Sequence, residues 1–364
     1  MTAIPHSTVA AVLDKEAGAL VVRDIPVASI YEDEILIAAK ACSVKAVDNY
    51  HIDYSWAPDG SVFGTRVSGY VVKVGESVTR FKPGDYVASF IHGGDFTSPA
   101  KGAYSKLAIT QEIYSIKLDH LEQSTIDHIP YGKVTTYEGA SELVGTLVTI
   151  GISLYKTLGG SFENPQNKSF LIYGGSTSTG LVAAKFAKLF GWRVISVASR
   201  KNQDLVKHFG ADYFVDYHDQ DFVEQIKTID SDITIALHAV GGESTLGFVV
   251  DSMSTRLPSR IDSLVCSDFS AFEKINPQIS YSMTRAFTAN GRDVVYANGQ
   301  AYSPLRGMKE TTREFLLRAE KLINDGTLEH VPLCVCPGGL EGINYALQVI
   351  RNREVSAEKL VIRI

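Results

Sequence analysis

Leu171–Gly180, which reads LIYGGSTSTG, joins a short apolar run to a turn of glycine, serine and threonine. The apolar run is typical of a buried strand, and a helical pattern begins directly after the turn. Small residues there let the backbone approach a pyrophosphate, whose charge is stabilised by the positive N-terminus of a helix. The stretch predicts a dinucleotide-binding turn made of Gly174, Gly175, Ser176, Thr177, Ser178, Thr179 and Gly180.

The glycine spacing of this turn departs from the usual G-x-G-x-x-G pattern. The three positions hold Gly175, Thr177 and Gly180, so the middle glycine is replaced. A merely tight strand–helix turn is therefore the alternative. The surroundings favour the cofactor site, because apolar strand-like runs alternate with helical ones from Phe170 to Ala239. Such alternation predicts a parallel sheet with helices on both faces, a doubly wound Rossmann domain.

The end of the second predicted strand, Val194–Ala198, indicates which cofactor binds. NAD sites place an acid there for the ribose 2′-hydroxyl, whereas NADP sites place cations for the 2′-phosphate. The sequence continues with Ser199, Arg200 and Lys201, and no acid follows until Asp204. A hydroxyl and two cations suit a phosphate, so NADP(H) is predicted. The alternative is an exposed basic turn without a ligand.

The two ends of the chain have a different character. Residues 9–115 contain short alternating apolar runs, such as Ala103–Ile109, separated by turn signals such as Lys82-Pro83-Gly84-Asp85, which predicts a β-rich domain. Helical spacing of apolar residues then predicts a helix over Tyr137–Leu158. Residues 308–364 contain two amphipathic helical patterns and two short strands, and this tail is expected to return to the first domain. The length of 364 residues fits two domains.

Composition argues against several classes of partner. The formal net charge is −6 and no long basic block is present, so neither nucleic acid nor an anionic membrane is expected as a partner. Met1–His6 lacks the pattern of a secretory signal. The four cysteines form no disulfide framework, so a cytoplasmic protein with reduced thiols is expected.

The order and spacing of several motifs carry a family resemblance. The chain resembles the zinc-independent medium-chain dehydrogenases/reductases, near the quinone oxidoreductases and nearer to fungal NADPH-dependent reductases related to trans-acting polyketide enoyl reductases. The motifs are Gly69–Gly75 (GYVVKVG), Lys82–Val87 (KPGDYV), Gly102–Ser105 (GAYS), Gly174–Gly180, Gly210–Asp212 with Asp216 and Tyr217, and Ser356–Ile362 (SAEKLVI).

The resemblance implies a fold, domain boundaries and partners. It implies a GroES-like catalytic domain from residues 1–138 and 308–364, and a Rossmann NADP-binding domain from residues 139–307. It assigns Tyr217 to the pocket for the adenosine phosphate. A homodimer joined through the Rossmann domain is one of the assemblies found among such enzymes.

The positions that hold metal in zinc-dependent relatives carry other residues here. By the resemblance they correspond to Lys45, Thr65 and approximately Gly145, which are not a zinc ligand set. No metal is expected at Cys334-Val335-Cys336 either, on the assumption that the two thiols project from opposite faces of a strand. The sequence therefore predicts an enzyme without zinc.

Without a metal, electrophilic help must come from hydrogen bonds or from conjugation in the substrate. The quinone reductase pattern N-x-x-D-x-Y appears as Lys45–Tyr50 (KAVDNY), with lysine in the first place. By resemblance Tyr50 is the candidate proton donor, Lys45 can polarise a carbonyl oxygen, and Thr149 matches a threonine beside the nicotinamide. The alternatives are a packed aromatic with its hydroxyl bonded to the backbone for Tyr50, a solvated surface lysine for Lys45 and a backbone-bonded helical threonine for Thr149.

Together these features predict an NADPH-dependent reductase of enals, enones, quinones or reactive aldehydes. Two alternatives stay open at this point. One is a trans-acting enoyl reductase that partners a polyketide synthase, and the other is a non-catalytic NADPH-binding protein.

Overall fold

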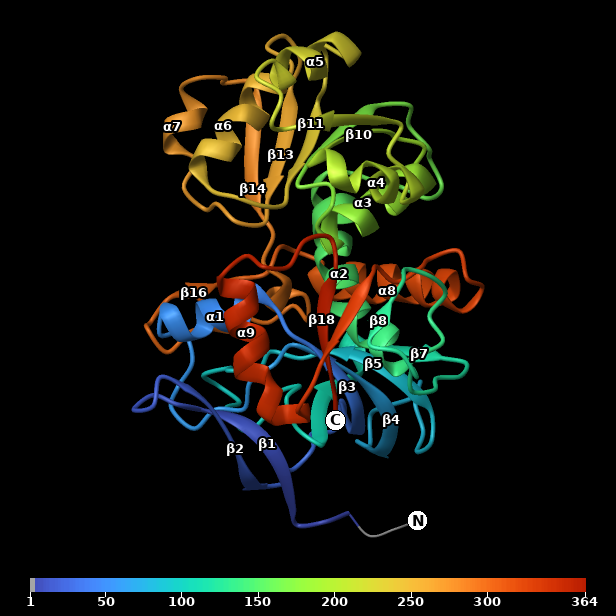
Figure 1. Cartoon of the computed structure of the whole chain (residues 1–364), viewed down its shortest axis with the longest axis vertical. Coiled ribbons are helices and arrows are strands. Elements are labelled where there is room, and N and C mark those ends of the chain that lie inside the picture. Colours follow the sequence, from blue (N-terminus) through green and yellow to red (C-terminus); the bar gives the residue numbers. More distant parts are fainter. Residues whose placement is uncertain (1–3) are drawn as a thin grey trace. The chain divides into compact units, whose positions relative to one another are not determined.

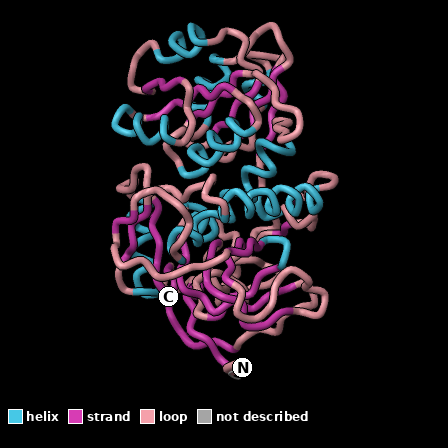
Figure 2. Tube along the Cα trace, turned by 90° about the vertical axis from the view of Figure 1, so that its right-hand side faces the viewer, coloured by secondary structure: helices cyan, strands magenta, loops and turns pink. Residues whose placement is uncertain are grey.

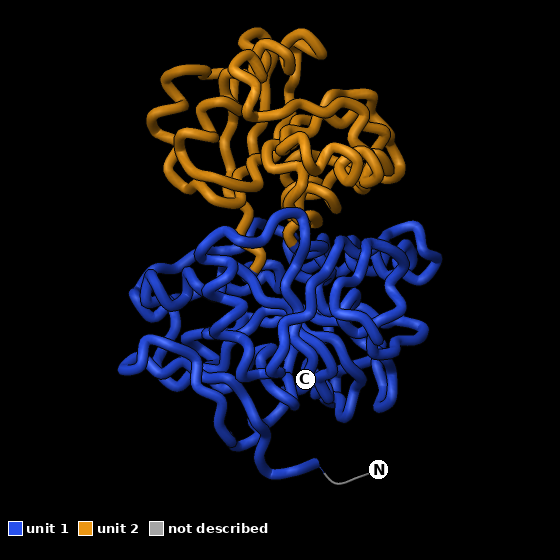
Figure 3. Tube along the Cα trace, viewed as in Figure 1, with its two compact units in different colours: residues 1–148, 287–364 blue, residues 149–286 orange. Residues whose placement is uncertain are grey.

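The computed structural model describes residues 4–364 and divides into two compact units. Unit 1 takes the chain up to residue 148 together with residues 287–364, and unit 2 takes residues 149–286 (Figure 3). The family domain boundaries expected at residues 138 and 307 stay a prediction. The expectation for Met1–His6 falls partly on residues 1–3, which lie outside the described residues.

Unit 2 is built on a six-stranded parallel sheet (Figure 1). In chain order its strands are β9 (Ser169–Tyr173), β10 (Arg193–Ala198), β11 (Tyr213–Asp216), β12 (Ile235–His238), β13 (Ser259–Ser263) and β14 (Ile279–Met283). They are arranged in the order β11-β10-β9-β12-β13-β14, which is the 3-2-1-4-5-6 order of Rossmann domains. The predicted doubly wound sheet is confirmed.

Helices connect these strands and cover the sheet. They are α3 (Ser178–Leu189), α4 (Gln203–His208), α5 (Phe222–Ile229), α6 (Glu243–Ser252) and α7 (Ser270–Glu273). Every residue of β9 is buried, as expected for a central strand with both faces covered. Leu171 of this strand packs with Ile195, Val215 and Ile261 of neighbouring strands in one apolar core. That core fixes the edge of the sheet from which the predicted cofactor turn emerges.

Unit 1 is built on an eight-stranded sheet. Its strands are β3 (Glu34–Ser43), β4 (Arg66–Val74), β5 (Tyr86–Phe90), β6 (Leu107–Gln111), β7 (Ser115–Leu118), β8 (His128–Ile129), β17 (Leu333–Cys336) and β18 (Lys359–Arg363). Strand β18 pairs antiparallel with β3, with Val361 opposite Ser43. The C-terminal tail thus returns to the first part of the chain, which confirms the predicted GroES-like unit built from both ends.

Smaller elements complete unit 1. Strands β1 (Ser7–Asp14) and β2 (Ala19–Pro26) form a hairpin, and β15 (Val294–Val295) pairs with β16 (Ala301–Tyr302). Its helices are α1 (Ala46–Asp53), α8 (Met308–Asn324) and α9 (Ile343–Arg351). Figure 2 shows how strands and loops make up most of this unit, while unit 2 alternates strands with helices. None of the helices within residues 4–364 is long and apolar enough to cross a membrane.

Three local expectations need correction. Helix α1 lies inside the segment expected to be β-rich. A strand expected at Ala103–Ile109 instead occupies Leu107–Gln111. The helix expected over Tyr137–Leu158 is α-helical as α2 (Tyr137–Ile150) and then becomes a π-helical turn over Gly151–Thr157. Wider turns of this kind are often found at functional sites.

Candidate active site

The turn between β9 and α3 requires glycine at three positions. A Cβ atom at Gly175 would lie 1.7 Å from Ser196 Oγ, and one at Gly180 would lie 2.4 Å from the carbonyl oxygen of Gly174. Gly174 itself has a φ of 92°, which favours glycine. These close approaches create the backbone cradle that a pyrophosphate needs at the N-terminus of a helix.

Thr177 replaces the middle glycine and has a role of its own. It is the N-cap of α3, where its Oγ1 accepts a hydrogen bond from the Gly180 N–H at 3.0 Å. The same hydroxyl donates to the Gly174 carbonyl at 2.8 Å. The threonine therefore holds both ends of the turn together, which explains how the pattern tolerates the loss of a glycine.

The residues predicted to bind the 2′-phosphate follow β10. Ser199 directly follows β10, and Arg200 and Lys201 begin the short helical turn after it. The Arg200 guanidinium donates to Asp219 at 3.0 Å, and its Nε lies 3.4 Å from Asp216. The Arg200 side chain is 63% exposed, so water screens its pairs with the two aspartates. The guanidinium is therefore available to an anion of higher charge, such as a phosphate.

Asp216 is a buried acid that sequence reasoning did not connect with this turn. It lies opposite Ala198 in the pairing of β10 with β11 and accepts the Arg200 backbone N–H at 3.1 Å. Burial alone would raise its pKa, but hydrogen bonds from the His218 backbone and ring and from Arg200 hold that pKa below its usual value. The hydrogen bonds that this carboxylate accepts therefore hold the turn after β10 in place.

Tyr217 follows Asp216 at the end of β11, and its half-exposed ring packs 4.1 Å from the His218 ring. Strands β9, β10 and β11 are parallel neighbours, so their carboxyl ends meet at one edge of the sheet. The structure therefore brings the glycine turn, the cationic turn and Tyr217 to the same edge. In Rossmann sheets this is the edge that binds dinucleotides.

In unit 1, Asp48 organises the start of α1. Its carboxylate accepts the Lys45 backbone N–H at 3.1 Å and the Tyr104 hydroxyl at 2.7 Å. Burial raises the pKa of Asp48 to about 6, against the opposing effect of these two hydrogen bonds. The acid of the K-x-x-D-x-Y pattern is therefore a positioning residue, because it fixes the first turn of the helix that carries Lys45 and Tyr50.

Lys45 is buried, so the alternative of a solvated surface lysine is wrong. The residue is 7% exposed, and its ammonium donates to Glu142 Oε2 of α2. Arg66 of β4 donates to the same oxygen at 3.1 Å. Burial lowers the pKa of Lys45, and the Arg66 charge lowers it further, while Glu142 acts in the opposite direction.

Glu142 is in direct contact with both cations, Lys45 and Arg66. Burial would raise its pKa, but Lys45 and Arg66 lower that pKa to about 2. The carboxylate is consequently ionised at neutral pH. Sequence reasoning missed Arg66 and Glu142, although an acid within the apolar run of α2 is a signal that a buried partner exists.

Tyr50 lies on α1 and is 42% exposed. Its ring is 6.0 Å from that of Tyr54, and partial burial raises its pKa. Among residues 4–364 no side chain or carbonyl forms a hydrogen bond with its hydroxyl, so the alternative of a hydroxyl bonded to the backbone is wrong. The hydroxyl is open to an incoming group.

Thr149 stands one residue before the end of α2, directly ahead of the π-helical turn. It is the first residue of unit 2, whereas Lys45 and Tyr50 belong to unit 1. Its assignment beside a nicotinamide stays a prediction.

His51, the residue after Tyr50, lies against a second histidine, His92. His51 Nε2 lies 3.4 Å from His92 Nε2, and His51 Nδ1 lies 2.9 Å from the Val47 carbonyl oxygen. Burial lowers the pKa of His51 to about 4 and that of His92 well below its usual value. His92 also lines a cavity of about 140 Å³ with Tyr114 and Phe287.

The residues at the positions expected for a catalytic metal do not fit one. Lys45 is a cation engaged with Glu142, and Thr65 is fully buried. A Cβ atom at Gly145 would lie 2.1 Å from Arg66 Nε, so a cysteine there would collide with the arginine. These positions hold a lysine but no thiolate, imidazole or carboxylate, and Arg66 adds a second cation beside them, which opposes the binding of Zn²⁺.

Two family models match the chain in agreement with this geometry. Residues 31–119 match the alcohol dehydrogenase GroES-like domain, and residues 178–256 match the zinc-binding dehydrogenase family. With the Rossmann strand order and the glycine cradle, these matches define an oxidoreductase fold that uses a nicotinamide cofactor.

Relatives extend the match over nearly the whole chain. The Saccharomyces cerevisiae protein YLR460C is 32% identical over 99% of this chain and 98% of its own. The trans-enoyl reductase resD of Aspergillus sclerotiorum is 29% identical over 95% of this chain and 97% of its own. The chain belongs to the medium-chain dehydrogenase/reductase superfamily and is related to fungal trans-enoyl reductases.

Solved structures support the same fold. A putative zinc-dependent alcohol dehydrogenase from Rhizobium etli superposes with a TM-score of 0.77 at 21% identity, covering 99% of each chain. Quinone oxidoreductase from Pseudomonas syringae gives 0.71 at 19% identity, covering 98% of this chain and 99% of its own. At such identities the likeness establishes the architecture alone.

Proposed function

We propose that the protein is a cytoplasmic, zinc-independent reductase that uses NADPH to reduce activated C=C or C=O bonds. The substrate class comprises enals, enones, quinones and reactive aldehydes. The observation that carries the proposal is the glycine cradle at the carboxyl edge of the Rossmann sheet, next to a turn with two cations.

NADPH is favoured over NADH by the side chains after β10. Arg200 offers a planar fork of donors to a phosphate, and Lys201 and Ser199 can add a charge and a hydroxyl. The acid of this region, Asp216, is buried and already accepts hydrogen bonds from Arg200 and His218. When bound, the cofactor supplies the hydride, and the protein supplies the position and the electrostatics.

Lys45 is proposed to polarise the carbonyl oxygen of the substrate. Its buried ammonium keeps N–H groups beyond the one that it gives to Glu142, and Arg66 adds a second positive charge to the cluster. Fixed cations in a dry site stabilise developing negative charge more strongly than water does. Glu142 acts through Lys45 and Arg66 as a positioning residue.

Tyr50 is proposed as the proton donor. A resonance-stabilised enolate accepts its proton from water without much help, whereas a localised alkoxide requires a positioned acid. The Tyr50 hydroxyl suits that role because no described residue engages it. We also propose that Thr149 orients the nicotinamide, as its counterpart does in similar enzymes.

Zinc independence follows from the misfit of Lys45, Thr65 and Gly145 to a metal. After prolonged chelation the enzyme should keep its full NADPH-dependent activity. Activity that disappears on chelation and returns with zinc would contradict this part of the proposal.

A second candidate function is a trans-acting enoyl reductase that receives its substrate from a polyketide synthase. The relative resD, 29% identical to this chain, bears the name trans-enoyl reductase. A homodimer through the Rossmann domain is also a proposal, for which the open edge strand β14 is available.

The test is an acceptor screen with NADPH. Aldehydes, enones, quinones and enoyl thioesters are compared under identical conditions, with NADPH oxidation as the readout and product analysis to identify the reduced bond. We expect turnover of enones or aldehydes. Turnover restricted to enoyl thioesters on a carrier protein would favour the second candidate, and NADPH binding without any turnover would identify a non-catalytic binding protein.

A further inference from the structure

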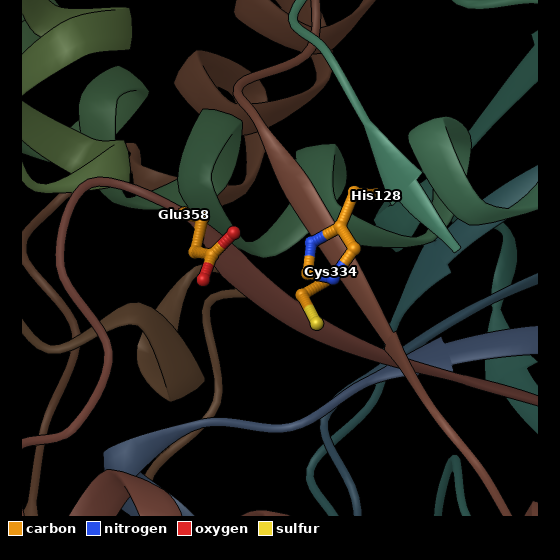
Figure 4. A group of neighbouring side chains, drawn as sticks. All are labelled: His128, Cys334 and Glu358. Carbon is orange, nitrogen blue, oxygen red and sulfur yellow. The ribbon is translucent and has the colours of Figure 1, made fainter. Parts of the chain in front are cut away.

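Three side chains of metal-binding types gather at one side of the unit 1 sheet. They are His128 of β8, Cys334 of β17 and Glu358, which directly precedes β18. One ligand atom from each lies within 4.8 Å of the other two. Figure 4 shows the Glu358 carboxylate directed toward the His128 ring, with the Cys334 sulfur beside that ring.

The strand register produces this group. Strands β8 and β17 run antiparallel with Cys334 directly opposite His128. Strands β17 and β18 run parallel with Leu333 opposite Lys359, so Glu358, directly before β18, lies beside the start of β17. The three residues therefore come from neighbouring segments of a rigid sheet rather than from one loop.

The two cysteines of β17 share a face, so the assumption that they project from opposite faces was wrong. Residues two apart in a strand lie on the same side of the sheet. Cys336 is buried in the apolar core of unit 1, and Cys334 packs against the margin of that core while remaining partly exposed. Cys334 is thus the thiol of this pair that solvent can reach.

The ligand atoms of the group are not engaged elsewhere. Within residues 4–364, no hydrogen bond or ion pair occupies the side chains of His128, Cys334 or Glu358. The neighbouring Asp127 differs, because its carboxylate is held by Arg363 at 2.7 Å. The group therefore offers one nitrogen, one sulfur and one oxygen ligand, with a fourth position open to water.

We propose that His128, Cys334 and Glu358 form a Zn²⁺ site, distinct from the positions of a catalytic metal. Zinc accepts this mixture of nitrogen, sulfur and oxygen at about 2.0–2.3 Å, which places ligand atoms about 3.3–3.8 Å apart. The ligand atoms must therefore move closer by no more than about 1.5 Å, which rotation of the exposed His128 and partly exposed Glu358 side chains allows. Mg²⁺ and Ca²⁺ prefer oxygen ligands alone.

Metal binding has two physical consequences. The Cys334 thiol loses its proton to solvent as the sulfur–zinc bond forms, so affinity should fall as pH is lowered. The ion would also join β8, a strand of two residues, to β17 and β18. Bound zinc should therefore raise the melting temperature in a concentration-dependent way.

The test uses the reduced, chelator-treated full-length protein titrated with Co²⁺ and then Zn²⁺. We expect one equivalent of Co²⁺ to give a sulfur-to-cobalt charge-transfer band that Zn²⁺ abolishes by displacement. Cys334→Ser should remove the band, and His128→Ala and Glu358→Gln should each weaken affinity at least about tenfold. Reductase activity should stay unchanged in all three variants.

Two matched controls locate the site. Cys266→Ser removes another thiol, and His120→Ala removes another exposed imidazole, so both should bind Co²⁺ as the wild type does. His128→Ala keeps the test decisive if Cys334→Ser fails to fold, because His128 is exposed. The proposal is overturned if the wild type gives no thiolate band, if the band survives Cys334→Ser, or if His128→Ala leaves the affinity unchanged.

Discussion

The two charged regions of the molecule differ in how much water reaches them. Arg200 and Lys201 of unit 2 lie on an exposed turn, where Arg200 pairs with Asp219 at the surface. Lys45 and Arg66 of unit 1 share the fully buried carboxylate of Glu142. Exposed pairs contribute little to stability and exchange partners readily, whereas a buried cluster cannot lose one member without a large cost.

This difference assigns separate tasks to the two regions. A cation that is screened and loosely held can leave its acid for a phosphate, which suits selective binding of a cofactor. A side chain held in a dry, ion-paired cluster keeps its position, which suits polarisation of a reacting carbonyl. Substitutions should therefore affect stability in one region and cofactor affinity in the other.

The largest effect is expected for Glu142→Gln. Removing the carboxylate leaves Lys45 and Arg66 buried without a counter-charge, which should lower the free energy of unfolding by about 3–5 kcal/mol. Denaturant unfolding measures the loss. Glu320→Gln is the matched control, because its pair with Arg80 is partly exposed and should cost about 1 kcal/mol or less. Equal losses of unfolding free energy in the two variants would contradict the difference between the buried cluster and an exposed pair.

The same cluster should respond to pH. Lys45 and Arg66 lower the pKa of Glu142 to about 2 from its ordinary value of 4.5. A depressed carboxyl pKa stabilises the fold above the unfolded-state value, and that stabilisation is lost as pH falls toward the folded-state value. The difference in unfolding free energy between the wild type and Glu142→Gln should shrink as pH falls from 4.5 toward 2. A difference that stays constant would show that the carboxylate charge is not its source.

Tyr50→Phe should lower kcat/KM for aldehydes by about 100-fold or more, and for enones by less, because an alkoxide needs the acid more than an enolate does. Stability should change by no more than about 0.5 kcal/mol, since the exposed hydroxyl has no partner to lose. Tyr54→Phe is the control, being a more exposed tyrosine at the end of the same helix. Wild-type turnover of every acceptor by Tyr50→Phe would leave water or Lys45 as the proton source.

Arg200→Ala should weaken NADPH binding about tenfold and leave NADH binding unchanged, because a charged hydrogen bond to the 2′-phosphate is lost. Its melting temperature should match that of the wild type. Arg256→Ala, which removes another exposed arginine of unit 2, should change neither affinity. A parallel loss of NADH affinity would show that Arg200 contacts a part common to both cofactors.

Asp219→Asn should have the smallest effect. Asp219 competes with the 2′-phosphate for Arg200, and its negative charge repels the phosphate. The asparagine amide should therefore strengthen NADPH binding by at most about fivefold. Isothermal titration at low ionic strength measures the gain. Weaker binding by this variant would indicate that Asp219 orients Arg200 rather than competing for it.

Features that depend on residues close together in the chain, such as the cofactor turn, could be predicted from the sequence. The turn from Gly174 to Gly180 is recognisable because its tight approaches permit only small residues at fixed spacing. The buried cluster was not predictable in the same way, because Lys45 and Glu142 are 97 positions apart and meet only through folding. Helix α1 escaped prediction because it is short and buries polar residues such as Asp48 and His51 rather than an apolar stripe.

The zinc-site group shows the same limit. His128, Cys334 and Glu358 have no motif in common, and the register of β8, β17 and β18 is what unites them. The assumption that the Cys334 and Cys336 thiols lie on opposite faces of the strand was incorrect, and it argued against a metal at Cys334. Side-chain geometry across a sheet therefore adds information that the order of residues does not contain.

The central claim is that the turn after β10 selects the 2′-phosphate. The most direct measurement is a fluorescence titration of the wild-type protein with NADPH and with NADH in the same buffer. NADPH should bind more than tenfold tighter, because two cationic hydrogen bonds to a phosphate are together worth more than about 1.4 kcal/mol. Equal affinities for the two cofactors would contradict the account.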